Sequence, residues 1–219
     1  MRKLVHVLLV SGLAVTLLGA AAQPASAGAI LSPVTASASN TFDGNILHTI
    51  DQTGLSPTFI SGVTDFNTYI AGGPTHASPD ASNAWSGSLA ALPIDLDFGL
   101  GATYSIGDLA LWTSFSGFSI NRFTVFTANN AGFVGAVNVG SFDANDTLPP
   151  MAAQVFSLAP SVGSFLRLEI LSNEGGPAVN LSEIGVEVSP NAAAVPEPAS
   201  LLLLGTGLAA VARRRLRRR

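Results

Sequence analysis

Few residues of this chain could perform catalysis. The sequence contains no cysteine, and two of its three histidines, His48 and His76, lie in its central part, outside any His-x-x-x-His metal spacing. The Gly-x-Ser-x-Gly nucleophile elbow is absent. Asp95 and Asp97 could form a carboxylate pair, but a glycosidase needs two carboxylates that converge across a cleft. The simpler interpretation is that both keep an exposed sheet face soluble and block edge pairing.

The basic residues are concentrated at the two ends of the chain. Residues 28–190 contain thirteen of the fourteen acidic residues but only two basic ones, Arg122 and Arg167. This part therefore has a formal net charge near −11, although the whole chain has −4. Such a charge repels nucleic acid and anionic polymers, so no nucleic-acid partner is expected, and it favours hard cations such as calcium.

The N-terminus has the three regions of a secretory signal peptide. Arg2 and Lys3 are basic, residues 4–22 are largely apolar, and Ala25 and Ala27 form an Ala-x-Ala cleavage site before Gly28. We predict a signal peptide over residues 1–27, handled by the Sec translocon and signal peptidase. The alternative is a first transmembrane helix, which Pro24 and the small residues fit less well.

The C-terminus combines a short apolar run with a basic end. Residues 199–212 carry no charge before Arg213, but fourteen helical residues reach only about 21 Å across a hydrocarbon core of about 30 Å. The six arginines of residues 213–219 favour the cytoplasmic side. We predict a short transmembrane helix and a basic cytoplasmic tail, which hold the chain transiently in the inner membrane. A permanent anchor and a basic nucleic-acid-binding tail are the alternatives.

The same end resembles a known sorting signal. Pro196, Glu197 and Pro198, followed by the apolar run and the arginines, are similar to the PEP-CTERM signal of exopolysaccharide-producing Gram-negative bacteria. The resemblance implies that exosortase, a membrane protease-transpeptidase, recognises Pro-Glu-Pro and removes the tail. It also implies delivery to the cell surface or extracellular matrix.

The central part has the pattern of an all-β protein. Ile94, Leu96 and Phe98 alternate with polar residues, as do residues 166–170 and 184–188. Further strands are expected near residues 109–113, 123–128, 136–142 and 153–158, with turns at 98–101, 129–132, 143–150 and 173–177. Short strands between such turns predict an antiparallel sandwich or jelly roll over residues 41–190. A segment at 28–40 precedes this domain, and a linker at 191–198 follows it.

Several pieces of this domain resemble the discoidin-like, or coagulation-factor type C, branch of the galactose-binding-domain superfamily. They are Thr49-Ile50-Asp51-Gln52-Thr53-Gly54-Leu55, Ala84-Trp85-Ser86, Ile94-Asp95-Leu96-Asp97-Phe98-Gly99, Ile106-Gly107-Asp108-Leu109-Ala110-Leu111-Trp112, Phe165-Leu166-Arg167-Leu168-Glu169-Ile170 and Leu181-Ser182-Glu183-Ile184-Gly185-Val186-Glu187. The resemblance implies a jelly roll of about eight strands with Trp85 packed under the sheet. Phe98 stands where the family often has leucine, and the family's disulfide is absent.

This resemblance also implies a structural calcium ion, held by Asp51 and Glu183 with backbone carbonyls. The alternative is that Asp51 caps a turn and Glu183 is a solvated strand-edge charge. The resemblance further implies that a carbohydrate ligand would bind to loops at one end of the sandwich, where the candidates are Tyr69, His76 and Trp85, with Phe115 and Phe118. Alternatively, the first two are loop residues without a ligand, and the two phenylalanines cover one end of the sandwich.

Together these observations predict an exported surface or matrix protein with a non-catalytic β-sandwich domain, associated with exopolysaccharide or biofilm. A carbohydrate-binding module that recognises extracellular polysaccharide is the alternative. A glycoside-active enzyme is a weaker alternative.

Overall fold

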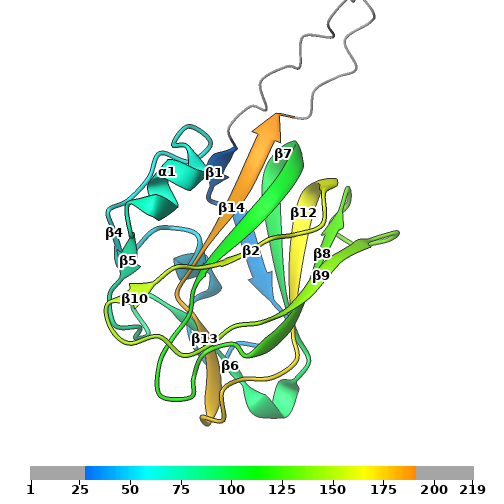
Figure 1. The fold of residues 1–219 in the computed structure, drawn as a ribbon. Helices are drawn as coiled ribbons and strands as arrows, with labels where there is room; N and C mark the ends of the chain where they lie inside the picture. Colours follow the sequence, from blue (N-terminus) through cyan, green and yellow to red (C-terminus); the bar gives the residue numbers. More distant parts are fainter. Residues whose placement is uncertain (1–27, 191–219) are drawn as a thin grey trace, which may run out of the picture.

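The computed structural model describes residues 28–190, which form an all-β domain with one short α-helix (Figure 1). The large sheet contains β1 (Ala29–Leu31), β2 (Thr35–Ala38), β7 (Ile94–Trp112), β8 (Arg122–Ala128), β9 (Val137–Asp143), β11 (Gln154–Phe156), β12 (Ser161–Ile170) and β14 (Glu183–Pro190). Two smaller sheets contain β4 (Leu55–Ser56), β5 (Thr75–His76) and β10 (Met151–Ala152), and β3 (Asp43–Gly44), β6 (Trp85–Ser88) and β13 (Ala178–Leu181). The helical segments are α1 (Phe66–Ala71) and the 3-10 helices η1 (Ile46–Thr49) and η2 (Leu89–Ala91).

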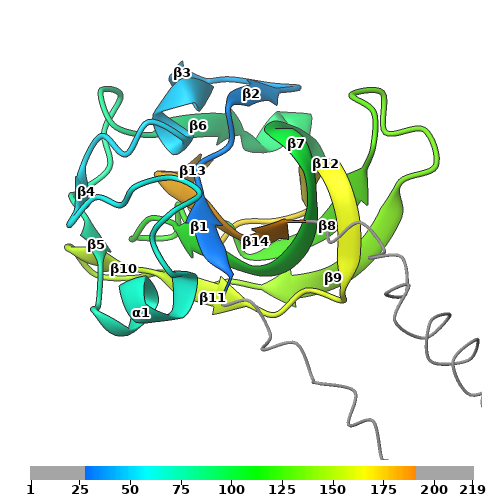
Figure 2. The same ribbon diagram turned by 90° about the horizontal axis from the view of Figure 1, so that it is seen from above.

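Strand β7 is the centre of the large sheet. Along one edge it pairs with β2 and then β14, and along the other with β12 and then β11, always antiparallel. Figure 2 shows how β7 curves around the inside of the domain. The turn expected at residues 98–101 is therefore wrong. Leu100 is buried in the core, and Gly101, with φ +82°, provides the bend without ending the strand.

The alternating patterns do place one face of each strand in the core. Ile94, Leu96 and Phe98 of β7 are fully buried, as are Leu166, Leu168 and Ile170 of β12. The strands expected near residues 109–113, 123–128, 136–142, 153–158 and 184–188 are also confirmed, as β7, β8, β9, β11 and β14. Trp85 is fully buried in the same core, and its indole N–H donates to Thr41 Oγ1 at 3.0 Å. The expected position of Trp85 under the sheet is confirmed.

Residues 28–40, which were predicted to precede the sandwich domain, contribute two strands to the large sheet. β1 pairs with β14 and β2 pairs with β7, so the sheet begins at Ala29, before residue 41. The two ends of the described part consequently lie side by side (Figure 1). Within residues 28–190, no helix is long and apolar enough to cross a membrane. The predicted signal peptide with its Ala25 and Ala27 cleavage site, the linker, the apolar segment and the arginine tail lie outside the described residues.

Candidate functional site

The three-stranded sheet β13-β6-β3 has an apolar inner face and a polar outer face. Trp85 and Leu181, which are paired across β6 and β13, point into the core. The next row across the sheet pairs Ser86 with Asp43 on one side and with Asn180 on the other. Because neighbouring residues along a strand point to opposite faces, these three side chains share the outer face.

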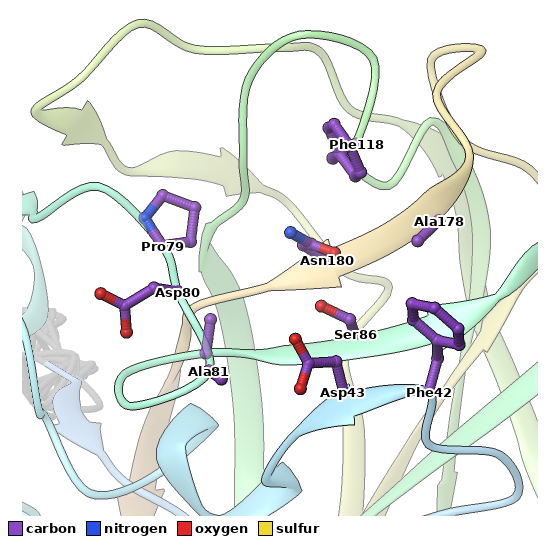
Figure 3. Close-up of a pocket in the computed structure, with 10 residues that line it drawn as sticks. Phe42, Asp43, Pro79, Asp80, Ala81, Ser86, Phe118, Ala178 and Asn180 are labelled. Carbon is purple, nitrogen blue, oxygen red and sulfur yellow. The ribbon is translucent and has the colours of Figure 1, made fainter.

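Two aromatic side chains stand at the border of this polar row, which we call the polar floor (Asp43, Ser86, Asn180). Phe42 precedes β3 and is 71% exposed, and Phe118 belongs to the loop between β7 and β8. Together with the loop around Asp80 they enclose a pocket of about 200 Å³ over the polar floor (Figure 3). Aromatic surface beside a few polar groups is the usual composition of a small-molecule site.

The loop that carries Phe118 is held in place from two directions. Asp146 accepts hydrogen bonds from the backbone N–H of Gly117 at 2.6 Å and from that of Ser119 at 3.3 Å. The backbone N–H of Asn180 donates to the carbonyl oxygen of Phe118 at 2.7 Å. Gly117 has φ +85°, and a Cβ there would lie 2.7 Å from the nitrogen of Gly176, so this position requires glycine. The backbone near Phe118 is thus fixed relative to the polar floor.

The opposite wall of the pocket is a loop with its own hydrogen bonds. Asn83 accepts from the backbone N–H of Asp80 at 2.7 Å and donates to the carbonyl oxygen of Ser78 at 3.1 Å. Asp80 Oδ1 accepts from the backbone N–H of Ser82 at 2.7 Å and from its hydroxyl at 2.6 Å. These bonds to the charged form hold the pKa of Asp80 below its usual value, so the carboxylate is ionised at neutral pH.

The polar floor contains one unsatisfied acceptor. Asn180 Oδ1 is buried, and no hydrogen-bond donor lies within reach of it in the described part of the chain. Figure 3 shows Asn180 on the strand beside Ser86, between the two walls of the pocket. An unmade hydrogen bond at a buried acceptor is unfavourable, but because this oxygen is buried, the Asn180 amide would have to turn before a bound hydroxyl or amine could donate to it.

The predicted calcium residues, Asp51 and Glu183, lie close together at another place. Glu183 is fully buried, and its Oε2 accepts the backbone N–H of Gln52 at 2.8 Å. Burial raises the pKa of Glu183 well above its usual value, and the charge of Asp51 adds to this. Burial acts in the same direction on Asp51, but hydrogen bonds from Thr53 and His48 outweigh it and lower the pKa of Asp51.

The fit of this pair to a calcium ion is incomplete. Glu183 Oε1 is buried without a hydrogen-bond partner among residues 28–190. This oxygen would be free to coordinate a cation. However, His48 and Thr53 already contact both oxygens of Asp51. No group of three or more His, Asp or Glu side chains in the described part could hold a metal. A calcium ion here would need backbone carbonyls for most of its six to eight oxygens.

Tyr69 and His76, two of the residues predicted for a ligand loop, are buried. Tyr69 packs edge-to-face on Phe59 with ring centroids 5.2 Å apart, and its hydroxyl donates to the carbonyl oxygen of Pro57. Burial, followed by the charge of Glu183, raises the pKa of Tyr69. His76 is fully buried, with Nε2 2.8 Å from the carbonyl oxygen of Thr53. Both side chains hold the backbone of residues 53–57 in place and form no part of a ligand surface.

Of the two predicted phenylalanines, only Phe118 lines the pocket, and Phe115 does not. The sequence prediction missed the other aromatic residue, Phe42, and all three members of the polar floor. The dipeptide Phe42-Asp43 was no specific signal for this wall, because Phe142-Asp143 has the same sequence and does not line the pocket. No local signal could show that Ser86 and Asn180 lie beside Asp43, because that depends on strand pairing.

The carboxylate pair Asp95 and Asp97 has a structural partner on the outer face of the large sheet. Arg167 donates to both oxygens of Asp97 at 2.6 and 2.8 Å, and it approaches Asp95 to 2.7 Å. The ring of Phe133 covers the guanidinium, 4.3 Å from its Cζ to the ring centroid. Asp95 and Asp97 share a face because they are two residues apart in β7, and these contacts give both carboxylates a structural role on that face.

Comparisons with known proteins concern the C-terminal signal and the fold of the domain. Residues 194–219 match the PEP-CTERM protein-sorting motif, whereas no curated protein matches the chain. The C-terminal domain of a chitobiase from Bacteroides fragilis is similar in structure, with a TM-score of 0.51, 15% identity, and coverage of 73% of this chain and 97% of that chain.

A second similar structure is a variant of chitosan-binding module 1 derived from chitosanase/glucanase from Paenibacillus sp. IK-5. Its TM-score is 0.50 at 15% identity, over 73% of this chain and 98% of that chain. A truncated AlyQ with CBM32 and alginate lyase domains gives a TM-score of 0.50 at 15% identity, over 78% of this chain and 37% of that chain. At such identity these likenesses establish the fold alone. The chain therefore carries a PEP-CTERM sorting motif, which indicates export, after a domain with the discoidin-like, galactose-binding-like β-sandwich fold.

Proposed function

We propose that the domain is a non-catalytic carbohydrate-binding module of an exported protein, and that it binds extracellular polysaccharide in the pocket over the polar floor. The observation that carries this proposal is the row Asp43, Ser86 and Asn180 between the rings of Phe42 and Phe118. The apolar face of a sugar ring can pack on an aromatic side chain while its hydroxyls bond to the polar floor.

The similar structures support this proposal only as neighbours in fold. One of them is named as a chitosan-binding module, and another contains a CBM32 domain next to an alginate lyase domain. The ion pairs of Asp95 and Asp97 with Arg167 give these carboxylates a structural role, which leaves little support for a glycoside-active enzyme.

A glycan array followed by polysaccharide pull-down tests the proposal. The exported protein should retain at least one neutral or charged polysaccharide, and Phe118→Ala should weaken binding because it removes one wall of the pocket. Val162→Ala, at an exposed position of β12, is the matched control that removes apolar surface elsewhere. Failure of every glycan to bind would end the proposal, as would equal binding by the wild type and Phe118→Ala.

The processing of the protein is a separate part of the proposal. The sorting motif supports export, recognition of Pro196, Glu197 and Pro198 by exosortase, and delivery to the cell surface or extracellular matrix of a biofilm-forming Gram-negative bacterium. Mass spectrometry of the surface form should find a C-terminus near residue 198. Recovery of intact Arg219 in that form would contradict exosortase cleavage.

A further inference from the structure

The pocket is lined by two carboxylates and by no basic side chain. Asp43 Oδ1 accepts the backbone N–H of Gly44 at 2.8 Å, and Asp80 Oδ1 accepts both donors of Ser82. In the described part of the chain, no donor contacts Oδ2 of either residue. Each carboxylate therefore keeps one oxygen that no donor of the described residues contacts.

No lysine or arginine of residues 28–190 compensates for these charges at the pocket, although His48, when protonated, acts on Asp80. Residues 28–190 contain no lysine and only two arginines. Arg167 is held by Asp95 and Asp97, and Arg122 pairs with Asp143 at 3.1 Å. With a formal net charge near −11, the domain repels anionic ligands and attracts cations, most strongly where carboxylates face a hollow.

We propose that this pocket selects polysaccharides built of amino sugars with protonated amines, over neutral and anionic ones. The inference rests on the proposed carbohydrate-binding function and names its ligand class. An ammonium group at the sugar ring donates charge-assisted hydrogen bonds to Asp43 or Asp80, while the rings of Phe42 and Phe118 hold the sugar itself. A uronate would bring a third negative charge to the same place.

The test compares two ligands that differ at the amine. Isothermal titration of the exported protein with a glucosamine tetramer and with the N-acetylglucosamine tetramer isolates this group, because acetylation removes the charge and keeps the ring. At low salt the glucosamine tetramer should bind at least tenfold more tightly, and this advantage should shrink as salt is added. Asp43→Asn and Asp80→Asn should each weaken glucosamine binding by roughly five- to tenfold.

Asp108→Asn is the matched control, since it removes the same charge from β7 outside the pocket. It should leave the affinity for the glucosamine tetramer unchanged. Equal weakening by Asp108→Asn and Asp80→Asn would overturn the inference, because binding would then follow net charge. Circular dichroism verifies that each variant is folded, and the amide oxygen introduced by Asp80→Asn can still accept from Ser82.

Two further outcomes separate this inference from the proposed function. Equally tight binding of both tetramers, or preference for the acetylated one, would overturn the selection of amines but leave carbohydrate binding in place. If no glycan of the array binds, the proposed function and the inference fail together.

Discussion

Replacement of Glu183 by glutamine tests how a buried carboxylate affects this domain. Glu183 is fully buried, its Oε2 accepts the backbone N–H of Gln52, and its Oε1 has no partner within residues 28–190. Burial raises the pKa of this carboxyl well above its usual value. Glutamine has nearly the same shape and keeps an acceptor for Gln52, but it does not titrate. The variant therefore isolates the cost of ionisation.

The sign of the effect follows from proton linkage. An unfolded glutamate has a pKa of about 4.3, and the folded pKa of Glu183 lies higher, so the folded state binds more protons above this pH. The stability contributed by Glu183 is complete below about pH 4.3 and is lost as the pH rises through the folded pKa. In this window the free energy of unfolding of the wild type should fall, relative to Glu183→Gln, by up to about 1.4 kcal/mol per pH unit.

For a domain of this size, 1 kcal/mol corresponds to about 2–4 °C in Tm, so the expected difference is up to roughly 3–6 °C per pH unit. Differential scanning calorimetry from pH 4 to 8 in EGTA measures it. Glu187→Gln, on the same strand but only partly buried, is the matched control. A difference between the wild type and Glu183→Gln that stays constant over this range would refute the reasoning.

The same two proteins test the calcium ion that the sequence predicts at Asp51 and Glu183. A ligand that binds the folded state raises its stability, so if calcium binds at this pair, millimolar calcium should raise the Tm of the wild type and not that of Glu183→Gln. An unchanged Tm of the wild type between EGTA and calcium would contradict a site formed by Asp51 and Glu183.

The remaining predictions concern the pocket loop, the ion-pair cluster and the core. Asp146→Ala should cost about 1–2 kcal/mol and weaken polysaccharide binding, because Gly117 and Ser119 lose their acceptor; unchanged affinity would show that this loop does not position Phe118. Arg167→Gln should lower the free energy of unfolding by about 1–2 kcal/mol, since Asp95 and Asp97 lose their counterion at a partly exposed position. In a double-mutant cycle, the further change Asp97→Asn should cost less in the Arg167→Gln background than in the wild type. Leu168→Ala should cost about 2–5 kcal/mol in urea unfolding, whereas Val162→Ala on the same strand should stay within about 0.5 kcal/mol; similar losses would contradict the assigned faces of β12.

Local patterns were sufficient for the strands and for the sorting signal. Leu166, Leu168 and Ile170 alternate with polar residues, and period-two alternation directly determines which face of a strand is buried. A sorting signal is read along the chain, so Pro196, Glu197 and Pro198 could be recognised without any tertiary structure. The turn at residues 98–101 was predicted wrongly because glycines also occur at bends inside a long strand.

The candidate site, by contrast, depends on contacts between distant segments. Asp43, Ser86 and Asn180 form one row only because β3 and β13 both pair with β6 in a particular register. Tyr69 and His76 have side chains suited to bind sugar, but the structure buries both of them. The sequence by itself determined the sorting signal and which strand faces are apolar. Only the tertiary structure decided which polar groups meet, because strand pairing and burial are set by the whole core.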